Sequence, residues 1–215
     1  MTQIYDVCII GAGLTGISTT LKILDKDPNI KIKLFDLGRP PGKRRRQLEG
    51  WMGAFPAGDG KFYLNDIEKV SNKTNEKQTK LNYKWFSNLL KESGELNITH
   101  DELPLKRLQN KIVKEGFEIQ QNNYIQWIPD TIHQFSRNVA EKIKEKVELS
   151  CDDEVTLIEK VGNEFRLISQ IGETFCKNVV IAAGRSGWRW LKDVYKHLDV
   201  PMQDTYATFG LRVVV

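Results

Sequence analysis

Cysteine is scarce in this sequence, and no two cysteines stand close enough to form a Cys-x-x-Cys pair. The three cysteines are Cys8, Cys151 and Cys176. An odd number at such wide spacing argues against a disulfide framework and against a dithiol redox centre. Cys8 lies within an apolar run, where cysteine acts as a small core residue. The pattern predicts reduced thiols and, by default, a cytoplasmic protein.

Long apolar runs and a strongly one-sided charge are also missing. No run approaches the roughly 18 residues that span a bilayer, and the N-terminus lacks the basic region of a signal peptide. The net charge is +4, and part of the excess is local to the basic run KRRR (43–46). A nucleic-acid surface needs a broader basic stripe with aromatic side chains. We therefore expect no membrane partner and disfavour a nucleic-acid partner.

Glycine is the residue type that carries a signal. The stretch YDVCIIGAGLTGIS (5–18) places Gly11, Gly13 and Gly16 directly after an apolar run. The Gly-x-Gly-x-x-Gly pattern alone is weak, because glycine-rich turns are common. A dinucleotide site also needs a strand before the pattern, a helix after it and an acidic residue about 20 positions further on.

All three of these features are present. Residues 5–10 are apolar and rich in β-branched side chains, as in a buried parallel strand. Residues 14–23 have apolar positions at helical spacing. A second strand is expected over 30–35, and it leads into Asp36, 20 residues past Gly16. The context predicts a real dinucleotide-binding turn.

Each position of this turn has a mechanical reason. Gly11 allows the tight turn, Gly13 lets the backbone approach a pyrophosphate, and Gly16 lets the helix pack against the strands. The first N–H groups of the helix offer partial positive charge to phosphates. Asp36 is placed to accept hydrogen bonds from ribose hydroxyls. The residues predicted to bind the cofactor here are Gly11, Gly13, Leu14, Thr15, Gly16, Asp36 and Leu37.

The rest of the chain changes character twice. Residues 65–128 are rich in Lys, Asn, Glu and Gln, with helical spacing over 83–93 and 103–116. The elements expected after this stretch are a helix (131–146), an antiparallel meander that begins with VELSC (147–151), a buried apolar strand (179–183), a helix (187–200) and a last strand, FGLRVVV (209–215).

A second motif follows the meander. The stretch NVVIAAGRSG (178–187) is an apolar strand that ends in a small-small-glycine turn. It resembles the Ala-Thr-Gly-type motif of the glutathione-reductase-like FAD superfamily. This resemblance implies that Ala182, Ala183 and Gly184 pass close to the dinucleotide beside the glycine loop. It also implies that the backbone of Val155 contacts the adenine.

A third motif, GWMGAFPAGDGKF (50–62), narrows the resemblance. It is similar to the GxGGAGxxSDGK-like loop of the predicted FAD-dependent dehydrogenases. That family also carries an AxGRSGxxWL segment and a later GVRV segment, and AAGRSGWRWL and FGLRVVV occur here in the same order. In this sequence Pro-Ala-Gly (56–58) replaces the tighter spacing of the family. The resemblance implies FAD as the cofactor, with binding residues Gly58, Asp59, Gly60, Lys61 and Arg185.

The resemblance implies an α/β fold, a three-layer FAD/NAD(P)-binding Rossmann-like domain with a β-meander and a partly helical insertion. The FAD-binding domain is expected to be discontinuous, over 1–64 and 129–215, with residues 65–128 as the insertion or cap. Relatives continue past the GVRV segment. We therefore expect the C-terminal part of the FAD-binding domain to be absent from these 215 residues, or to be supplied by a second chain.

Two cations have two interpretations each. Lys61 is either a cation that stabilises negative charge on the reduced flavin or an exposed loop lysine. Arg44 is either the arginine that related flavoproteins place near the pyrophosphate or ribityl chain, or part of a solvated charge run. Neither alternative is decided by the sequence.

Three functions are compatible with these observations. The first is an FAD-dependent, dehydrogenase-like oxidoreductase that transfers hydride from an unknown small-molecule substrate to flavin, with NAD(P)H as one electron donor to consider. The second is a non-catalytic or incomplete nucleotide-binding module that needs a partner chain to complete the flavin site. The third is an FAD-dependent nucleic-acid-modifying enzyme, and it rests only on the basic loop. The sequence predicts no catalytic acid or base and no metal site.

Overall fold

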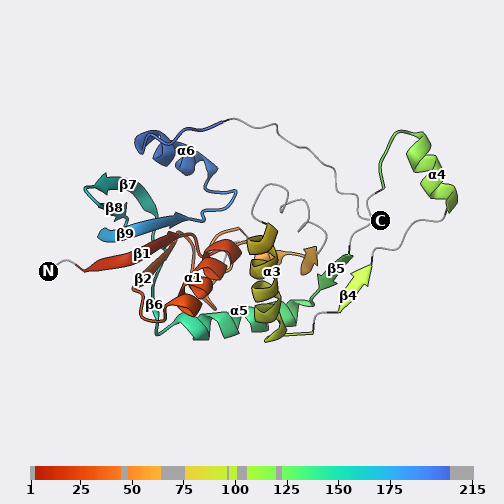
Figure 1. The fold of residues 1–215 in the computed structure, drawn as a ribbon, viewed down its shortest axis with the longest axis horizontal. Coiled ribbons are helices and arrows are strands. Elements are labelled where there is room, and N and C mark those ends of the chain that lie inside the picture. Colours follow the sequence, from red (N-terminus) through yellow and green to blue (C-terminus); the bar gives the residue numbers. More distant parts are fainter. Residues whose placement is uncertain are drawn as a thin grey trace.

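A six-stranded sheet is the larger of the two sheets in the described part of the computed structural model (Figure 1, left), which covers residues 3–44, 48–63, 76–95, 97–100, 106–119 and 123–203. The strand order is β6-β2-β1-β9-β8-β7. The strands β6, β2, β1 and β9 run parallel, whereas β7, β8 and β9 are joined antiparallel. Their bounds are β1 (Ile4–Ile10), β2 (Ile32–Asp36), β6 (Val147–Cys151), β7 (Val155–Val161), β8 (Glu164–Ser169) and β9 (Glu173–Ile181).

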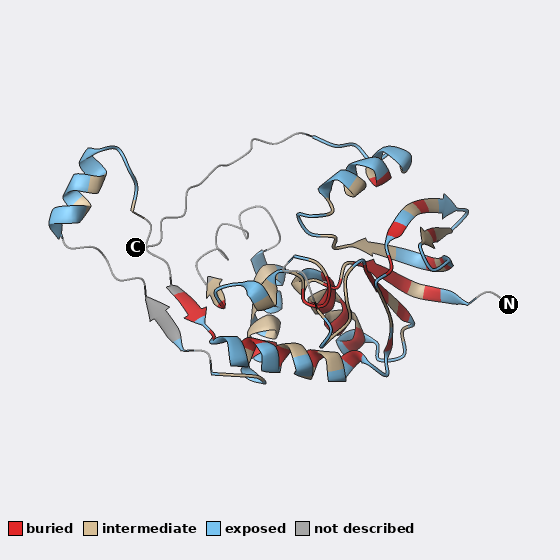
Figure 2. Ribbon diagram, turned by 180° about the vertical axis from the view of Figure 1, so that it is seen from behind, coloured by how far each residue is buried: buried red, intermediate tan, exposed pale blue. Residues whose placement is uncertain are grey.

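Two helices cover one face of this sheet. The apolar stripes of α1 (Leu14–Lys26) and α5 (Pro129–Ile143) belong to the same buried cluster as Ile9 and Leu34 of the strands. Burying a side chain of this size contributes about 1.5–3 kcal/mol. Figure 2 shows the buried residues along β1, β2 and one side of α5. The stripe on α5 consists of Ile132, Phe135, Val139 and Ile143.

The β7–β8 hairpin and α6 (Trp188–His197) cover the opposite face. Cys8 and Phe35 of the parallel strands form a second buried cluster with Ile158 and Leu167 of the hairpin and Val194 of α6. Helices, parallel sheet and meander thus form three layers. The predicted three-layer α/β arrangement with a meander is confirmed.

Two predictions about the strands were wrong. VELSC does not begin the antiparallel meander: it is β6, which pairs parallel with β2 in the register Ile32↔Val147. The reason is the crossover through α5, which returns the chain in the direction of β2. The apolar stretch 179–183 is only half-buried, because it ends at a cavity rather than inside the core. The strand predicted over 209–215 lies outside the described residues.

The stretch between the two halves of the sheet includes helices, as predicted, and a second small sheet. Its helices are α3 (Glu76–Lys91) and α4 (Lys106–Lys114), and its sheet has the order β3-β5-β4. The strands are β3 (Lys61–Tyr63), β4 (Ile98–His100) and β5 (Asn123–Gln126), and a short 3-10 turn, η1 (Phe55–Ala57), precedes them. In the described part of the chain, the helices are all too short or too polar to cross a bilayer.

Candidate functional site

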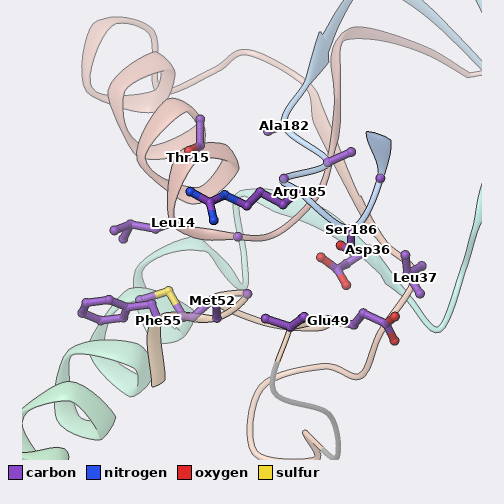
Figure 3. Close-up of a pocket in the computed structure, with 18 of the residues that line it drawn as sticks. Leu14, Thr15, Asp36, Leu37, Glu49, Met52, Phe55, Ala182, Arg185 and Ser186 are labelled. Atoms are coloured by element: carbon purple, nitrogen blue, oxygen red, sulfur yellow. The ribbon is translucent and has the colours of Figure 1, made fainter. Parts of the chain in front are cut away.

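A cavity of about 760 Å³ lies at the carboxyl ends of the parallel strands (Figure 3). Ile10 at the end of β1, Asp36 at the end of β2 and Ala182 just after β9 all line it. In open α/β sheets, ligands bind outside the carboxyl ends of the strands. The volume falls within the range of roughly 300–1,000 Å³ that is typical of small-molecule sites.

The glycine loop forms one wall of the cavity. At two of its glycines, a side chain would clash with the protein's own backbone. Gly11 has a φ of +104°, and a Cβ there would lie 2.3 Å from the carbonyl oxygen of Ala182. A Cβ on Gly16 would lie 1.9 Å from the carbonyl oxygen of Gly11. These glycines let α1 and the turn after β9 pack directly against the loop. Close packing of the helix is the role that the sequence predicted for Gly16.

Gly13 is different, because nothing in the described protein requires it to be glycine. Its φ of −70° and ψ of 176° suit any residue. The nearest atom to a Cβ there is Cα of Gly53, at an ordinary 4.0 Å. Gly13 also lines the cavity. Its missing side chain therefore leaves room on the cavity side, at the N-terminus of α1.

The structure brings nearly all of the predicted site residues into this one cavity. The exceptions are Gly16, which packs behind the loop, and Arg44. The predicted residues that line the cavity are Gly11, Gly13, Leu14, Thr15, Asp36, Leu37, Gly58, Asp59, Gly60, Lys61, Val155, Ala182, Ala183, Gly184 and Arg185.

Asp36 is held by backbone N–H groups from three segments. Its Oδ2 accepts from the backbone nitrogen of Ala12 at 2.7 Å. Its Oδ1 accepts from the backbone nitrogens of Gly38 at 2.8 Å and Gly50 at 2.9 Å. Asp36 is only 9% exposed. The carboxylate therefore ties the glycine loop to the turn after β2 and to the loop that returns at residue 50.

The residues predicted around the flavin have particular local roles. Gly60 has a φ of +70°, and a Cβ there would lie 2.2 Å from the carbonyl oxygen of Trp127, so the backbone itself requires this glycine. The Nζ of Lys61 lies 4.3 Å from the centroid of the Tyr124 ring, a cation–π distance. Lys61 is half-buried and lines the cavity, so it is not a plain exposed lysine.

Arg44 is not part of the cavity wall in this structure. Its guanidinium donates to the carbonyl oxygen of Trp51 at 3.3 Å. Burial lowers the pKa of Arg44, and the charge of Asp36 opposes this effect. Arg44 is half-buried, so the interpretation of this residue as part of a solvated charge run does not fit well either.

The sequence identified residues 50–62 as a motif, but it did not place Met52, which lies at the floor of the cavity, among the site residues. Met52 has a φ of +68°, its backbone nitrogen donates to the carbonyl oxygen of Ala12 at 2.7 Å, and it bridges in parallel to Gly13. These contacts join residues some 40 positions apart, so no local periodicity in the sequence predicts them. The residues missed are Ile10, Phe35, Leu48, Glu49, Asp153 and Glu154. Seven more lining residues lay in motifs that resemble the family but were not predicted to bind the cofactor: Met52, Gly53, Ala54, Phe55, Ser186, Gly187 and Trp190.

The cavity has a polar end and an apolar end (Figure 3). Asp36 and Glu49 lie together at one end, and Met52 and Phe55 lie at the other. Between the two ends, Arg185 extends toward the first turn of α1. The middle of the cavity therefore combines a guanidinium with the N-terminus of a helix, which favours bound anions.

Comparisons with known proteins give the fold a context. No protein-family model matches the chain, and no curated protein sequence does. Glycine oxidase from Geobacillus kaustophilus superposes with a TM-score of 0.53 at 16% identity, over 92% of this chain and 59% of that one. Glycine oxidase from Bacillus cereus gives 0.52 at 16% identity, over 91% and 58%.

A third structure is NikD, an unusual amino acid oxidase essential for nikkomycin biosynthesis. It superposes with a TM-score of 0.52 at 11% identity, over 91% of this chain and 54% of that one. The chain thus spans little more than half the length of these structures. At such identities the likeness shows the fold alone, which is the α/β fold that these oxidases share.

Proposed function

We propose that this chain binds FAD in the cavity at the glycine loop and forms the cofactor-binding part of an FAD-dependent oxidoreductase. The observation that carries the proposal is the order of the cavity wall. The carboxylates of Asp36 and Glu49 line one end, a helix N-terminus and Arg185 lie in the middle, and Met52 and Phe55 lie at the other end. This order matches the ribose, the pyrophosphate and the flavin ring of an extended FAD.

The residues present fit this cofactor by two independent observations. The space that a Cβ on Gly13 would fill belongs to the cavity, at the point where the helix offers its free N–H groups. In the described part of the chain, no protein group accepts a hydrogen bond from the buried Nε1 of Trp190, which belongs to the cavity wall. Buried polar atoms without a partner mark places where a ligand or water belongs.

Each part of the wall has a chemical task in this proposal. Leu37 and Leu48 are exposed beside the carboxylates, and they offer apolar contact to an adenine ring. Gly13 and Arg185 hold the pyrophosphate between backbone N–H groups and a guanidinium. Met52 and Phe55 exclude water from the flavin end, and the cation of Lys61 stabilises negative charge there. When bound, the flavin supplies the redox chemistry by accepting hydride from a small substrate.

The structural neighbours suggest which substrates to try first, since two are glycine oxidases and one is an amino acid oxidase. The test is anaerobic reduction of the FAD-loaded protein by glycine, other amino acids, NADH and NADPH. We expect at least one donor to bleach the visible band of the flavin. If every donor fails while FAD stays bound, the oxidoreductase half of the proposal is wrong.

A second candidate is a cofactor-holding module that a further segment or a partner chain completes. It is favoured by the coverage of the neighbours, because 91–92% of this chain matches only 54–59% of their lengths. Its signature is a stoichiometric partner on co-purification, together with flavin that becomes reducible only when the partner is present. Reduction of the isolated, FAD-loaded chain by a donor would rule this candidate out.

A further inference from the structure

Asp36 stands where this fold places a carboxylate for the ribose, but the protein itself uses most of its hydrogen-bonding capacity. An ionised carboxylate has about four acceptor positions. The backbone nitrogens of Gly38 and Gly50 occupy Oδ1, and that of Ala12 occupies one position of Oδ2. Asp36 therefore has one position left, on Oδ2, for a ligand.

The ribose of an adenosine carries two neighbouring hydroxyls, the 2′ and the 3′, and one acceptor position serves only one of them. A second acceptor at the same end of the cavity is Glu49, which is half-buried and lines the wall beside Asp36 and Leu37 (Figure 3). Glu49 was not identified from the sequence, because its position beside Asp36 depends on the contact between Gly50 and Asp36.

The backbone next to Glu49 is fixed by Asp36 itself. Gly50 donates to Asp36 Oδ1 and has a φ of +93°, and a Cβ there would lie 2.9 Å from the carbonyl oxygen of Arg39. Trp51 donates to that same carbonyl oxygen at 3.0 Å. The backbone that carries Glu49 is therefore fixed by hydrogen bonds, and Glu49 lines the same end of the cavity as Asp36 (Figure 3).

We infer that Glu49 is a ribose-binding residue of this cavity, whose carboxylate accepts a hydrogen bond from a ribose hydroxyl of an adenine nucleotide. This inference rests on the proposed function. It carries a consequence for specificity. Two carboxylates at the ribose repel a 2′-phosphate, so the site selects nucleotides with a free 2′-hydroxyl.

Calorimetric titration tests this role with ADP, 2′-deoxy-ADP and 3′-deoxy-ADP as probes. We expect the wild type to bind ADP about tenfold more tightly than at least one deoxy analogue, because that analogue lacks a hydroxyl that donates a hydrogen bond to a charged carboxylate. Glu49→Ala should lose about tenfold in ADP affinity and most of that discrimination. Glu49→Gln should improve the binding of adenosine 2′,5′-bisphosphate relative to ADP.

Glu145→Ala is the matched control, because Glu145 is exposed and lies outside the cavity wall. It should bind all the probes like the wild type, and thermal unfolding should show that Glu49→Ala remains folded. If Glu49→Ala keeps the affinity and the discrimination of the wild type, the role of Glu49 is wrong while the proposed function stands. If the folded wild type binds neither ADP nor FAD, the proposed function fails, and the role of Glu49 fails with it.

Discussion

The Oδ2 atom of Asp36 accepts a hydrogen bond from the backbone nitrogen of Ala12 at 2.7 Å, and this contact joins the end of β2 to the middle of the glycine loop. The other oxygen, Oδ1, accepts hydrogen bonds from the backbone nitrogens of Gly38 and Gly50. The residue identified from the sequence as a ribose ligand is therefore also the residue that organises the loops around the cavity.

Replacement of Asp36 by alanine should therefore destabilise the protein as well as weaken nucleotide binding. It leaves three backbone N–H groups without their acceptor, and a buried unpaired donor costs about 1–3 kcal/mol. We expect the free energy of unfolding in urea to fall by about 3 kcal/mol or more. Asp25→Ala is the control, because Asp25 forms only an exposed ion pair with Lys22. Equal urea midpoints for the two variants would contradict the structural role of Asp36.

Gly16 and Gly13 should respond to alanine in opposite ways. The new Cβ at position 16 meets the carbonyl oxygen of Gly11 at 1.9 Å, and such overpacking costs about 1–3 kcal/mol or more. Among the residues that the structure describes, the nearest atom to the new Cβ at position 13 is Cα of Gly53, at 4.0 Å. Gly16→Ala should therefore lower the melting temperature, whereas Gly13→Ala should keep it and lose FAD affinity. A stable Gly13→Ala protein that binds FAD normally would remove Gly13 from the pyrophosphate site.

A side-chain network across β1, β2 and β6 should make the free energy of unfolding depend on pH in the acidic range. The hydroxyl of Tyr5 donates to Glu148, and Lys33 pairs with the same carboxylate at 2.9 Å. The hydrogen bond from Tyr5 lowers the pKa of Glu148, burial opposes this, and Lys33 lowers it further. A lowered pKa in the folded state stabilises the protein above the ordinary value of 4.5, and this stabilisation is lost as the pH falls through the folded value.

Urea unfolding of the wild type and Tyr5→Phe, at about pH 6 and about pH 3, measures this effect. Removal of the hydroxyl raises the pKa of Glu148 toward its ordinary value. The variant should therefore lose less stability than the wild type between the two pH values. An identical or larger loss in the variant would show that Tyr5 does not control this carboxylate.

Thiol reactivity should be low until the protein unfolds. Cys8 and Cys176 are fully buried. Burial, with the nearby charges of Asp36 and Asp152, raises the pKa of Cys151 to about 12. Because the thiolate is the reactive form, a disulfide reagent near neutral pH should label no thiol rapidly in the folded state and all of them in denaturant. A rapidly labelled thiol in the folded protein would contradict the burial described here.

The sequence predicted the parts of this site that depend on local signals. The strand, turn and helix around Gly11 and Gly16 follow from periodicity and from glycine at fixed offsets, and Ala182 was implied by the resemblance of residues 178–187 to a family motif. The pairing of VELSC was predicted wrongly, because five residues of strand character carry no information about their partner. The parallel choice comes from α5, which packs on the same face as α1.

The floor of the cavity depends on contacts between distant residues. Met52 reaches the glycine loop through backbone atoms, which carry no side-chain signature. Glu49 reaches the end of the cavity formed by Asp36 because Gly50 is hydrogen-bonded to Asp36, a contact that spans 14 positions. Packing sets such loop geometry, so the sequence identified the glycine loop and residues 58–61 without showing how Glu49 and Met52 reach the same cavity.

The central claim, that the cavity at the glycine loop holds FAD, is tested most directly by a visible absorption spectrum of the purified chain during titration with FAD. The bound chromophore is then released and identified. We predict saturable, stoichiometric uptake of FAD that ADP competes away and that Gly13→Ala weakens. A folded chain that takes up neither FAD nor ADP would contradict the account.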